Sequence, residues 1–177
     1  MPELVSTSVL NGLFDTFEHT AWRLETQRAY EADTKSDRYK RWARGEGYSA
    51  VGREAFLNGR RALAEQGKRV ERVRIVDNPP TDNQRYLLDG AQVTIEAGED
   101  IRYLWRADAE RLALPMADFW LFDSCTLARF HHEDGRTLGL ELITDPAAVV
   151  AACQVRDAAW HFAALYEEFA ARVPSAM

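Results

Sequence analysis

Charged side chains gather near residue 100, where a predicted helix runs into a predicted strand. Alternation along that strand places Arg102 and Arg106 on one side of it, beside two acidic residues. Two guanidinium groups could bind a carboxylate or phosphate through paired hydrogen bonds. An ion-pair lattice across the sheet, which joins these residues to Arg72, Arg74, Arg129 and Glu141, fits the same pattern and is the interpretation we favour. The candidate ligand-binding residues are Glu99, Asp100, Arg102, Arg106, Asp123 and Glu141.

The chain offers few other groups for catalysis or metal binding. Cys125 follows a predicted turn, where the sequence places no cation or helix N-terminus to activate its thiol, and Cys153 is predicted to pack in the interior. His131 and His132 are neighbours on a predicted strand, so they point to opposite faces and do not suit one metal ion. Because the sequence contains no glycine-rich phosphate loop, dinucleotide fingerprint or nucleophile elbow, it predicts no catalytic residue, metal site or cofactor.

Charge is distributed unevenly along the chain, whose 177 residues carry a net charge of −6. Residues 1–75 hold 14 basic and 11 acidic side chains, whereas residues 76–177 hold 8 and 17. This asymmetry indicates either electrostatic pairing inside one fold, which we favour, or an interaction surface. Within the basic half, Arg38, Lys40, Arg41, Arg44, Arg53, Arg60 and Arg61 alternate with Tyr39, Trp42, Tyr48 and Phe56.

Three of these arginines, Arg41, Arg44 and Arg60, form the candidate surface for a protein partner. The basic stretch could also meet phosphates, but nonspecific nucleic-acid binding needs several cations on one face. The predicted helices over 35–44 and 50–66 lack the hydrophobic pattern of a helix-turn-helix, and the whole chain is acidic. The sequence therefore favours an acidic partner or a solvated face over direct nucleic-acid binding.

The pattern of apolar residues predicts an α+β fold. We expect a mixed or antiparallel sheet of about five or six strands, with N-terminal helices, one crossover helix and a long C-terminal helix. Residues 1–177 are expected to form a single domain, mainly helical over 1–68 with one possible strand, and an α/β core over 69–177. The expected strands are 21–25, 70–76, 101–105, 119–122, 126–132 and 137–143, and the expected helices include 9–18, 82–96 and one from 146 to about 173.

The last two strands are expected to form a hairpin. A three-residue loop, Glu133-Asp134-Gly135, places Phe130 opposite Leu138 and keeps the leucines away from the face that carries Arg129 and His131. A two-residue loop would shift the register by one residue, so the longer loop is favoured.

Several segments in their order along the chain resemble one known family. They are 17–25, 70–76, 81–86, 97–104, 118–123 and 139–147. Together they resemble the actinobacterial domain of unknown function 6879. The resemblance implies soluble cytoplasmic proteins with no agreed activity, often encoded beside helix-turn-helix regulators and small partner proteins, and hence no catalytic positions to transfer.

A fainter resemblance, at the level of the fold, is to one half of a phospholipase D-like fold. Its chemistry needs a His-x-Lys-x4-Asp run, in which the histidine is the nucleophile. With the aspartate set at Asp123, Met116 stands in the histidine position and Asp118 in the lysine position. The resemblance thus implies a non-catalytic copy, and a shared fold does not by itself establish function.

These observations favour a non-enzymatic regulatory or interaction protein that acts through a protein partner, for which a helix-turn-helix transcription regulator is the leading candidate. The alternative is a small-molecule-binding protein or an unfamiliar enzyme that uses residues 99–106 with Asp123, Cys125 and Glu141. No apolar run approaches the roughly 20 residues that span a bilayer, and no secretory signal begins the chain, so we expect a cytoplasmic protein without a membrane interaction.

Overall fold

A mixed sheet of seven strands forms the centre of the protein in a computed structural model that describes residues 2–174. The strand order is β6-β5-β4-β1-β2-β3-β7; β1, β2 and β3 run parallel, and every other neighbouring pair is antiparallel. The strands are β1 (Thr20–Glu25), β2 (Arg69–Val76), β3 (Glu99–Trp105), β4 (Phe119–Phe122), β5 (Thr126–Glu133), β6 (Arg136–Ile143) and β7 (Ala164–Leu165). The expected α+β class and mixed sheet are confirmed, with one strand more than expected.

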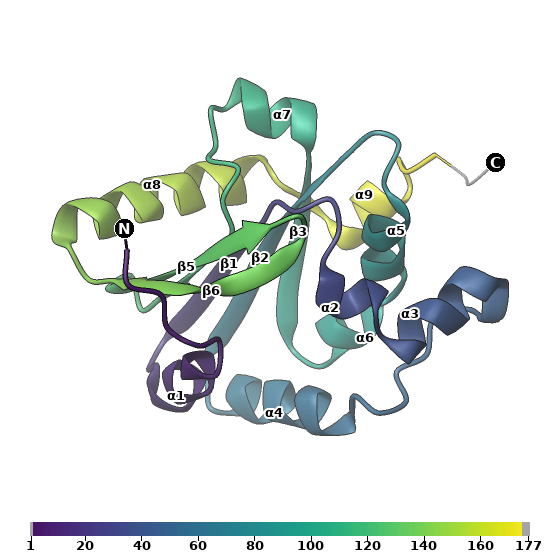
Figure 1. The fold of residues 1–177 in the computed structure, drawn as a ribbon, viewed down its shortest axis with the longest axis horizontal. Coiled ribbons are helices and arrows are strands. Elements are labelled where there is room, and N and C mark those ends of the chain that lie inside the picture. The colour runs from purple at the N-terminus through teal and green to yellow at the C-terminus, as the bar shows by residue number, and fades with distance from the viewer. Residues whose placement is uncertain (1, 175–177) are drawn as a thin grey trace.

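Helices cover both faces of this sheet (Figure 1). They are α1 (Val9–Thr16), α2 (Glu31–Thr34), α3 (Asp37–Arg41), the π-helix η1 (Trp42–Glu46), α4 (Glu54–Glu65), α5 (Asp82–Asp89), α6 (Ala91–Glu96), α7 (Arg106–Arg111), α8 (Pro146–Phe162) and α9 (Tyr166–Ala170). Figure 1 shows α7 and α8 on one side of the sheet and α1 and α4 on the other. No helix within residues 2–174 combines the length and the apolar character needed to cross a bilayer.

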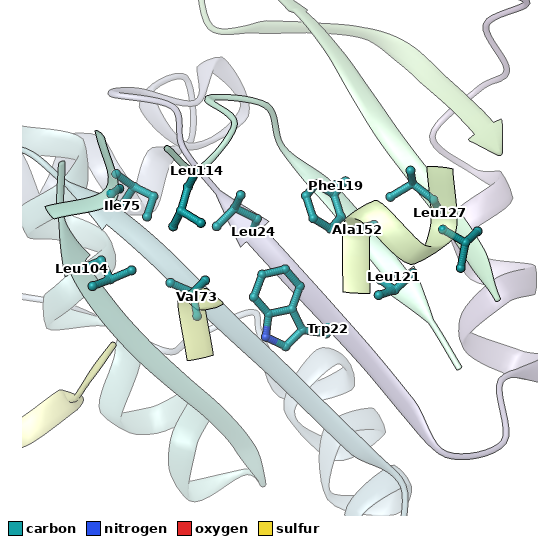
Figure 2. Close-up of a cluster of buried hydrophobic side chains, with 13 residues drawn as sticks. Trp22, Leu24, Val73, Ile75, Leu104, Leu114, Phe119, Leu121, Leu127 and Ala152 are labelled. Atoms are coloured by element: carbon teal, nitrogen blue, oxygen red, sulfur yellow. The ribbon is translucent and has the colours of Figure 1, made fainter. Parts of the chain in front are cut away.

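The face of the sheet toward α7 and α8 is apolar. Side chains alternate between the two faces of a strand, so Trp22 and Leu24 of β1 point the same way as Val73 and Ile75 of β2. These four residues, each at most 2% exposed, pack with Leu121 and with the inner side of α8 (Figure 2). This layer supplies the main hydrophobic core.

The opposite face mixes aromatic and charged residues. At one end, Phe17 and Trp120 pack with Phe14 of α1, and at the other end Tyr103 stacks on Phe169 of α9 at 4.9 Å between ring centroids. Between these two clusters the strands carry buried arginine and glutamate side chains. The fold therefore brings its charged residues together on this face, under α4.

The long C-terminal helix is present as α8, but it ends at Phe162 rather than near residue 173. The backbone becomes extended at Ala163, and the next two residues pair with the edge of β3 as β7. Phe162, the last residue of α8, is 58% exposed, whereas Phe169 on α9 is buried against β3. The apolar repeat continues across this break, so the sequence pattern alone could not reveal it.

The hairpin between β5 and β6 differs from the expected one. Asp134 and Gly135 both have positive φ and form a two-residue loop, which pairs Glu133 with Arg136. A bulge after His131 then shifts the register, so that Phe130 pairs with Leu140 instead of Leu138. Leu138 is 48% exposed and Leu140 is fully buried. The expected three-residue loop is wrong, because the bulge after His131 lets a two-residue loop bury Leu140 instead of Leu138.

Gly98 joins α6 to β3 in a backbone conformation that disfavours other residues. Its φ is +106°, and a Cβ at this position would lie 2.7 Å from the Cβ of Ala64 on α4. We expect Gly98→Ala to lower the free energy of unfolding by about 2 kcal/mol, because backbone strain adds to steric overlap. Urea denaturation measures this effect. Gly59→Ala, in open space on α4, should not destabilise the protein, and an equal loss in both variants would contradict the expectation.

Candidate functional site

A network of ion pairs lies on the face of the sheet beneath α4; we call it the sheet network. The parallel pairing of β1 and β2 sets Arg23 beside Arg72 and Glu25 beside Arg74. Glu99 follows on β3, and Arg60 reaches the network from α4. The members are Arg23, Glu25, Arg60, Arg72, Arg74, Glu99 and Asp118.

Arg72 occupies the centre of the sheet network. It donates from Nε to Glu99 Oε2 at 2.6 Å and from Nη1 to Glu25 Oε1 at 3.0 Å, and its guanidinium lies 5.0 Å from the ring of Trp120. Burial alone would raise the pKa of Glu99, but Arg72 and Arg60 outweigh that cost and hold it below its usual value. Glu99 is therefore a buried carboxylate that stays charged.

Arg74 extends the network toward α5. Its Nε donates to Glu25 Oε2 at 2.6 Å and its Nη1 donates to the carbonyl of Leu87 at 3.0 Å. Burial raises the pKa of Glu25, but Arg74, Arg23 and Arg72 together lower it far below the ordinary range. One carboxylate is thus shared by three arginines.

Asp118 closes the other end of the network and is fully buried. It accepts hydrogen bonds from the Thr26 backbone N–H and hydroxyl, both at 2.7 Å, and from the Tyr30 hydroxyl at 2.6 Å. Arg23 and His132 approach it at 3.7 Å. Burial raises the pKa of Asp118, whereas His132, Arg23 and the two hydroxyl donors lower it below its usual value. Its oxygens are occupied by protein donors, as a structural role requires.

The residues predicted near position 100 go to different places. Glu99 joins the sheet network, whereas Asp100 and Arg102 pair with each other at 3.0 Å, and Arg102 lies 3.8 Å from the ring of Trp160 on α8. Arg106 pairs with Asp77 at 2.8 Å. Adjacent strand residues point to opposite faces, which separates Glu99 from Asp100.

The other two predicted ligand residues, Asp123 and Glu141, also lie at separate places in the fold. Asp123 accepts from the backbone N–H groups of residues 18–20 at 2.7–2.8 Å, which closes the turn before β1. Glu141 pairs with Arg129 at 3.5 Å and with His131 at 3.1 Å. The six predicted ligand residues therefore do not line one common cavity. The lattice interpretation describes the Arg72–Glu99 and Arg129–Glu141 pairs.

The two cysteines and the histidines form no metal cluster. Cys125 is exposed, with the carbonyl of Phe122 at 3.5 Å from its sulfur, and Cys153 packs half-buried against the apolar core. Across residues 2–174, no three His, Cys, Asp or Glu side chains are grouped in a way that could hold a metal ion.

The three arginines expected at a partner surface also differ in their surroundings. Arg44 is exposed and donates to Glu46 at 2.8 Å. Arg41 is half-buried, and its Nε lies in the interior without a hydrogen-bond partner in the described part of the chain. Arg60 is 12% exposed and pairs with Glu99, so it belongs to the sheet network and not to the surface.

A cavity of about 300 Å³ lies where α3 and the start of α4 approach α5 and α6. Arg38, Arg53, Tyr48 and Phe56, all members of the basic and aromatic stretch, line it together with Tyr86. The sequence showed the alternation of cations and aromatic rings in this stretch, but it did not show that α5 and α6 complete a cavity. This site was missed by sequence reasoning.

Two comparisons with known proteins bear on this arrangement. A family model described as Domain of unknown function (DUF6879) matches residues 8–171, which include every strand of the sheet. A search of curated proteins gave no match. The family description assigns no activity, so function has to be argued from the residues of the chain.

Proposed function

Because that match covers nearly the whole chain, the protein belongs to the DUF6879 family, and we propose that it is a non-enzymatic regulatory protein that acts by binding an acidic protein partner. The partner class that the sequence resemblance suggests is a helix-turn-helix transcription regulator. The docking surface is the exposed side of α2, α3 and η1, which carries Lys35, Lys40 and Arg44.

The separation of charge carries this proposal. Residues 35–61 hold 8 basic and 3 acidic side chains, while the rest of the chain holds 14 and 25. Among these basic residues, Arg60 is used inside the fold, whereas Lys35, Lys40 and Arg44 are 73%, 55% and 63% exposed and form surface pairs with Glu31, Asp37 and Glu46. A basic patch on an acidic protein steers an acidic partner to one surface and repels it from the others.

The arrangement of carboxylates supports a binding role. Glu25, Glu99 and Asp118 are engaged by arginine, tyrosine and threonine donors inside the fold. General acid or base catalysis needs a group within hydrogen-bond reach of a substrate. These carboxylates stabilise the sheet instead.

Reversing two charges on the docking surface tests the proposal. We expect Lys40→Glu/Arg44→Glu to retain a specific partner at least fivefold less than the unchanged protein, since each exposed charge contributes up to about 1 kcal/mol. The measurement is capture on the immobilised protein from nuclease-treated lysate of its own source, followed by quantitative mass spectrometry. The expected partner is acidic over its contact surface.

The matched control is Arg69→Glu/Arg111→Glu, which reverses two exposed charges on β2 and α7, outside α2, α3 and η1. This variant should retain the partner at the unchanged level. If both double variants lose the same proteins to the same extent, or if no captured protein distinguishes them, the assignment of this surface is wrong.

A further inference from the structure

The cavity between α3 and α6 contains two guanidinium groups that no carboxylate neutralises. Arg38 comes from α3 and Arg53 directly precedes α4, and both line the space of about 300 Å³. Within residues 2–174, neither has an acidic oxygen within 4.0 Å, in contrast to Arg60, Arg72 and Arg74. Both residues are half-buried, so in the described part of the chain each keeps a positive charge at the cavity that no ion pair offsets.

Arg53 is fixed in position by neutral groups. It donates from Nη1 to the Tyr48 hydroxyl and from Nη2 to Thr94 Oγ1 at 3.2 Å, and its guanidinium lies 4.7 Å from the ring of Phe56. Hydroxyl and aromatic contacts orient the group while leaving its charge available. This is the preorganised cation that an anion site needs.

Arg38 is less engaged than Arg53. Its Nε is buried and has no hydrogen-bond partner among the described residues. Its Nη1 lies near Gly52, 3.7 Å from where a Cβ would stand. Glu54 influences Arg38 electrostatically but lies beyond ion-pair distance, and its carboxylate accepts from the backbone N–H of Gly52 at 3.1 Å. Arg38 therefore has unused donors.

Helices α5 and α6 form another wall of the cavity, and Tyr48 packs against this wall. A Cβ at Gly90 would overlap the Tyr48 ring, so the ring packs directly on the backbone between the two helices. Tyr48 also lies 5.5 Å from Tyr86, between ring centroids. The aromatic side of the cavity is thus rigid, and it suits the apolar part of a small molecule.

Asp33 is the acidic residue among those that line the cavity, and Arg74 is a third lining arginine. Arg74 already donates to Glu25 and to the carbonyl of Leu87, so these donors are used inside the fold. Asp33 is 3.4 Å from Asn83 Nδ2, and burial raises its pKa above the usual value. A carboxylate here would repel an anion next to it but could accept a hydrogen bond from a hydroxyl or amine of the same ligand.

We propose that this cavity binds a small phosphomonoester, with its phosphate between Arg38 and Arg53 and a hydroxyl or amine of its organic part on Asp33. A phosphomonoester carries nearly two negative charges at neutral pH, which match two guanidinium groups, whereas a carboxylate would neutralise one of them. The planar fork of arginine donors fits phosphate oxygens. The volume is at the lower end of ligand pockets. This site does not depend on a protein partner.

Isothermal titration of the full chain tests the proposal with glycerol 3-phosphate, ribose 5-phosphate and phosphoethanolamine. We expect at least one of them to bind, and inorganic phosphate to compete with it. Arg38→Gln should weaken that binding at least tenfold, because a charge-assisted pair of hydrogen bonds is lost. Arg61→Gln, an exposed arginine of α4 bonded to Asn58, is the control and should bind as the unchanged protein does.

Arg38→Gln removes no hydrogen bond made within residues 2–174, so the melting temperature should be unchanged and a binding defect can be read directly. Arg53→Gln should show the same loss with a lower melting temperature, since Arg53 also holds Tyr48 and Thr94. The proposal is overturned if phosphate and all three esters fail to bind at millimolar concentration. It is also overturned if glycerate binds as tightly as glycerol 3-phosphate, or if Arg38→Gln binds normally.

Discussion

Replacing Arg72 with Met should lower the free energy of unfolding by about 3–5 kcal/mol, the largest single-residue effect that we expect. The substitution removes the shared partner of Glu99 and Glu25, both of which stay buried. Met is similar in length to Arg, so the loss of packing against Trp120 is small compared with the loss of charged hydrogen bonds to two buried carboxylates, which within residues 2–174 keep only Arg60 and the Arg23/Arg74 pair as partners. Urea denaturation followed by tryptophan fluorescence measures the change.

Arg69→Met on the same strand is the matched control. Arg69 is exposed and pairs with Glu71 at 3.6 Å, so its removal should cost less than about 1 kcal/mol. The double variant Arg72→Met/Glu99→Gln should lose less free energy of unfolding than the two single variants lose in sum. Each single change leaves one partner of the Arg72–Glu99 pair without the other, and the double change removes both. Equal effects of Arg72→Met and Arg69→Met would show that the network does not support the fold.

The sheet network could be predicted in part. Alternation along 70–76 set Arg72 and Arg74 on the face opposite Val73 and Ile75, and this is confirmed. The sequence could not identify Glu25 as their partner, because nothing in it showed that β1 lies parallel beside β2. Strand order is decided by which surfaces pack together over the whole chain, and a local pattern contains little of that information.

The six predicted ligand residues show the same limit. They were grouped because they are charged and follow one another along neighbouring elements, but the structure uses each of them locally. Asp123 has a positive φ and caps three backbone N–H groups, and Arg106 pairs with Asp77. Backbone groups need hydrogen-bond partners at every turn, so charged residues next to turns are often occupied in this way.

For the cavity of Arg38 and Arg53, the sequence shows only that arginines and aromatic residues are frequent in this stretch. A run of arginines and aromatic residues does not reveal which of its members face solvent, the sheet or one another. The decisive contact is Tyr48 against Gly90, which joins residues 42 positions apart at the point where the helix expected over 82–96 is divided into α5 and α6. The cavity therefore forms only when α5 and α6 pack against the basic stretch, and a local sequence pattern does not reveal such a contact.

The free energy of unfolding should fall steeply as the pH is lowered, because buried carboxylates must take up protons. In the folded protein the pKa values of Glu25, Glu99 and Asp118 are lowered. Arginines overcome the effect of burial at the two glutamates, and His132, Arg23 and two hydroxyl donors overcome it at Asp118. The unfolded chain therefore binds protons at a higher pH than the folded protein does. The stabilisation is complete above the unfolded pKa values, near 4–4.5, and is lost as the pH falls toward the folded ones.

Each unit by which such a pKa is lowered contributes about 1.4 kcal/mol, so the three groups together should remove several kcal/mol between about pH 5 and 3. Asp33 and Glu71, whose pKa values are raised by burial, act in the opposite direction and offset part of the loss. The measurement is the free energy of unfolding in urea at a series of pH values. Asp118→Asn should flatten the profile, whereas Glu133→Gln, at an exposed carboxylate, should leave its slope unchanged. A free energy of unfolding that stays constant from pH 6 to 3 would mean that these carboxylates gain no net stabilisation from their arginine partners.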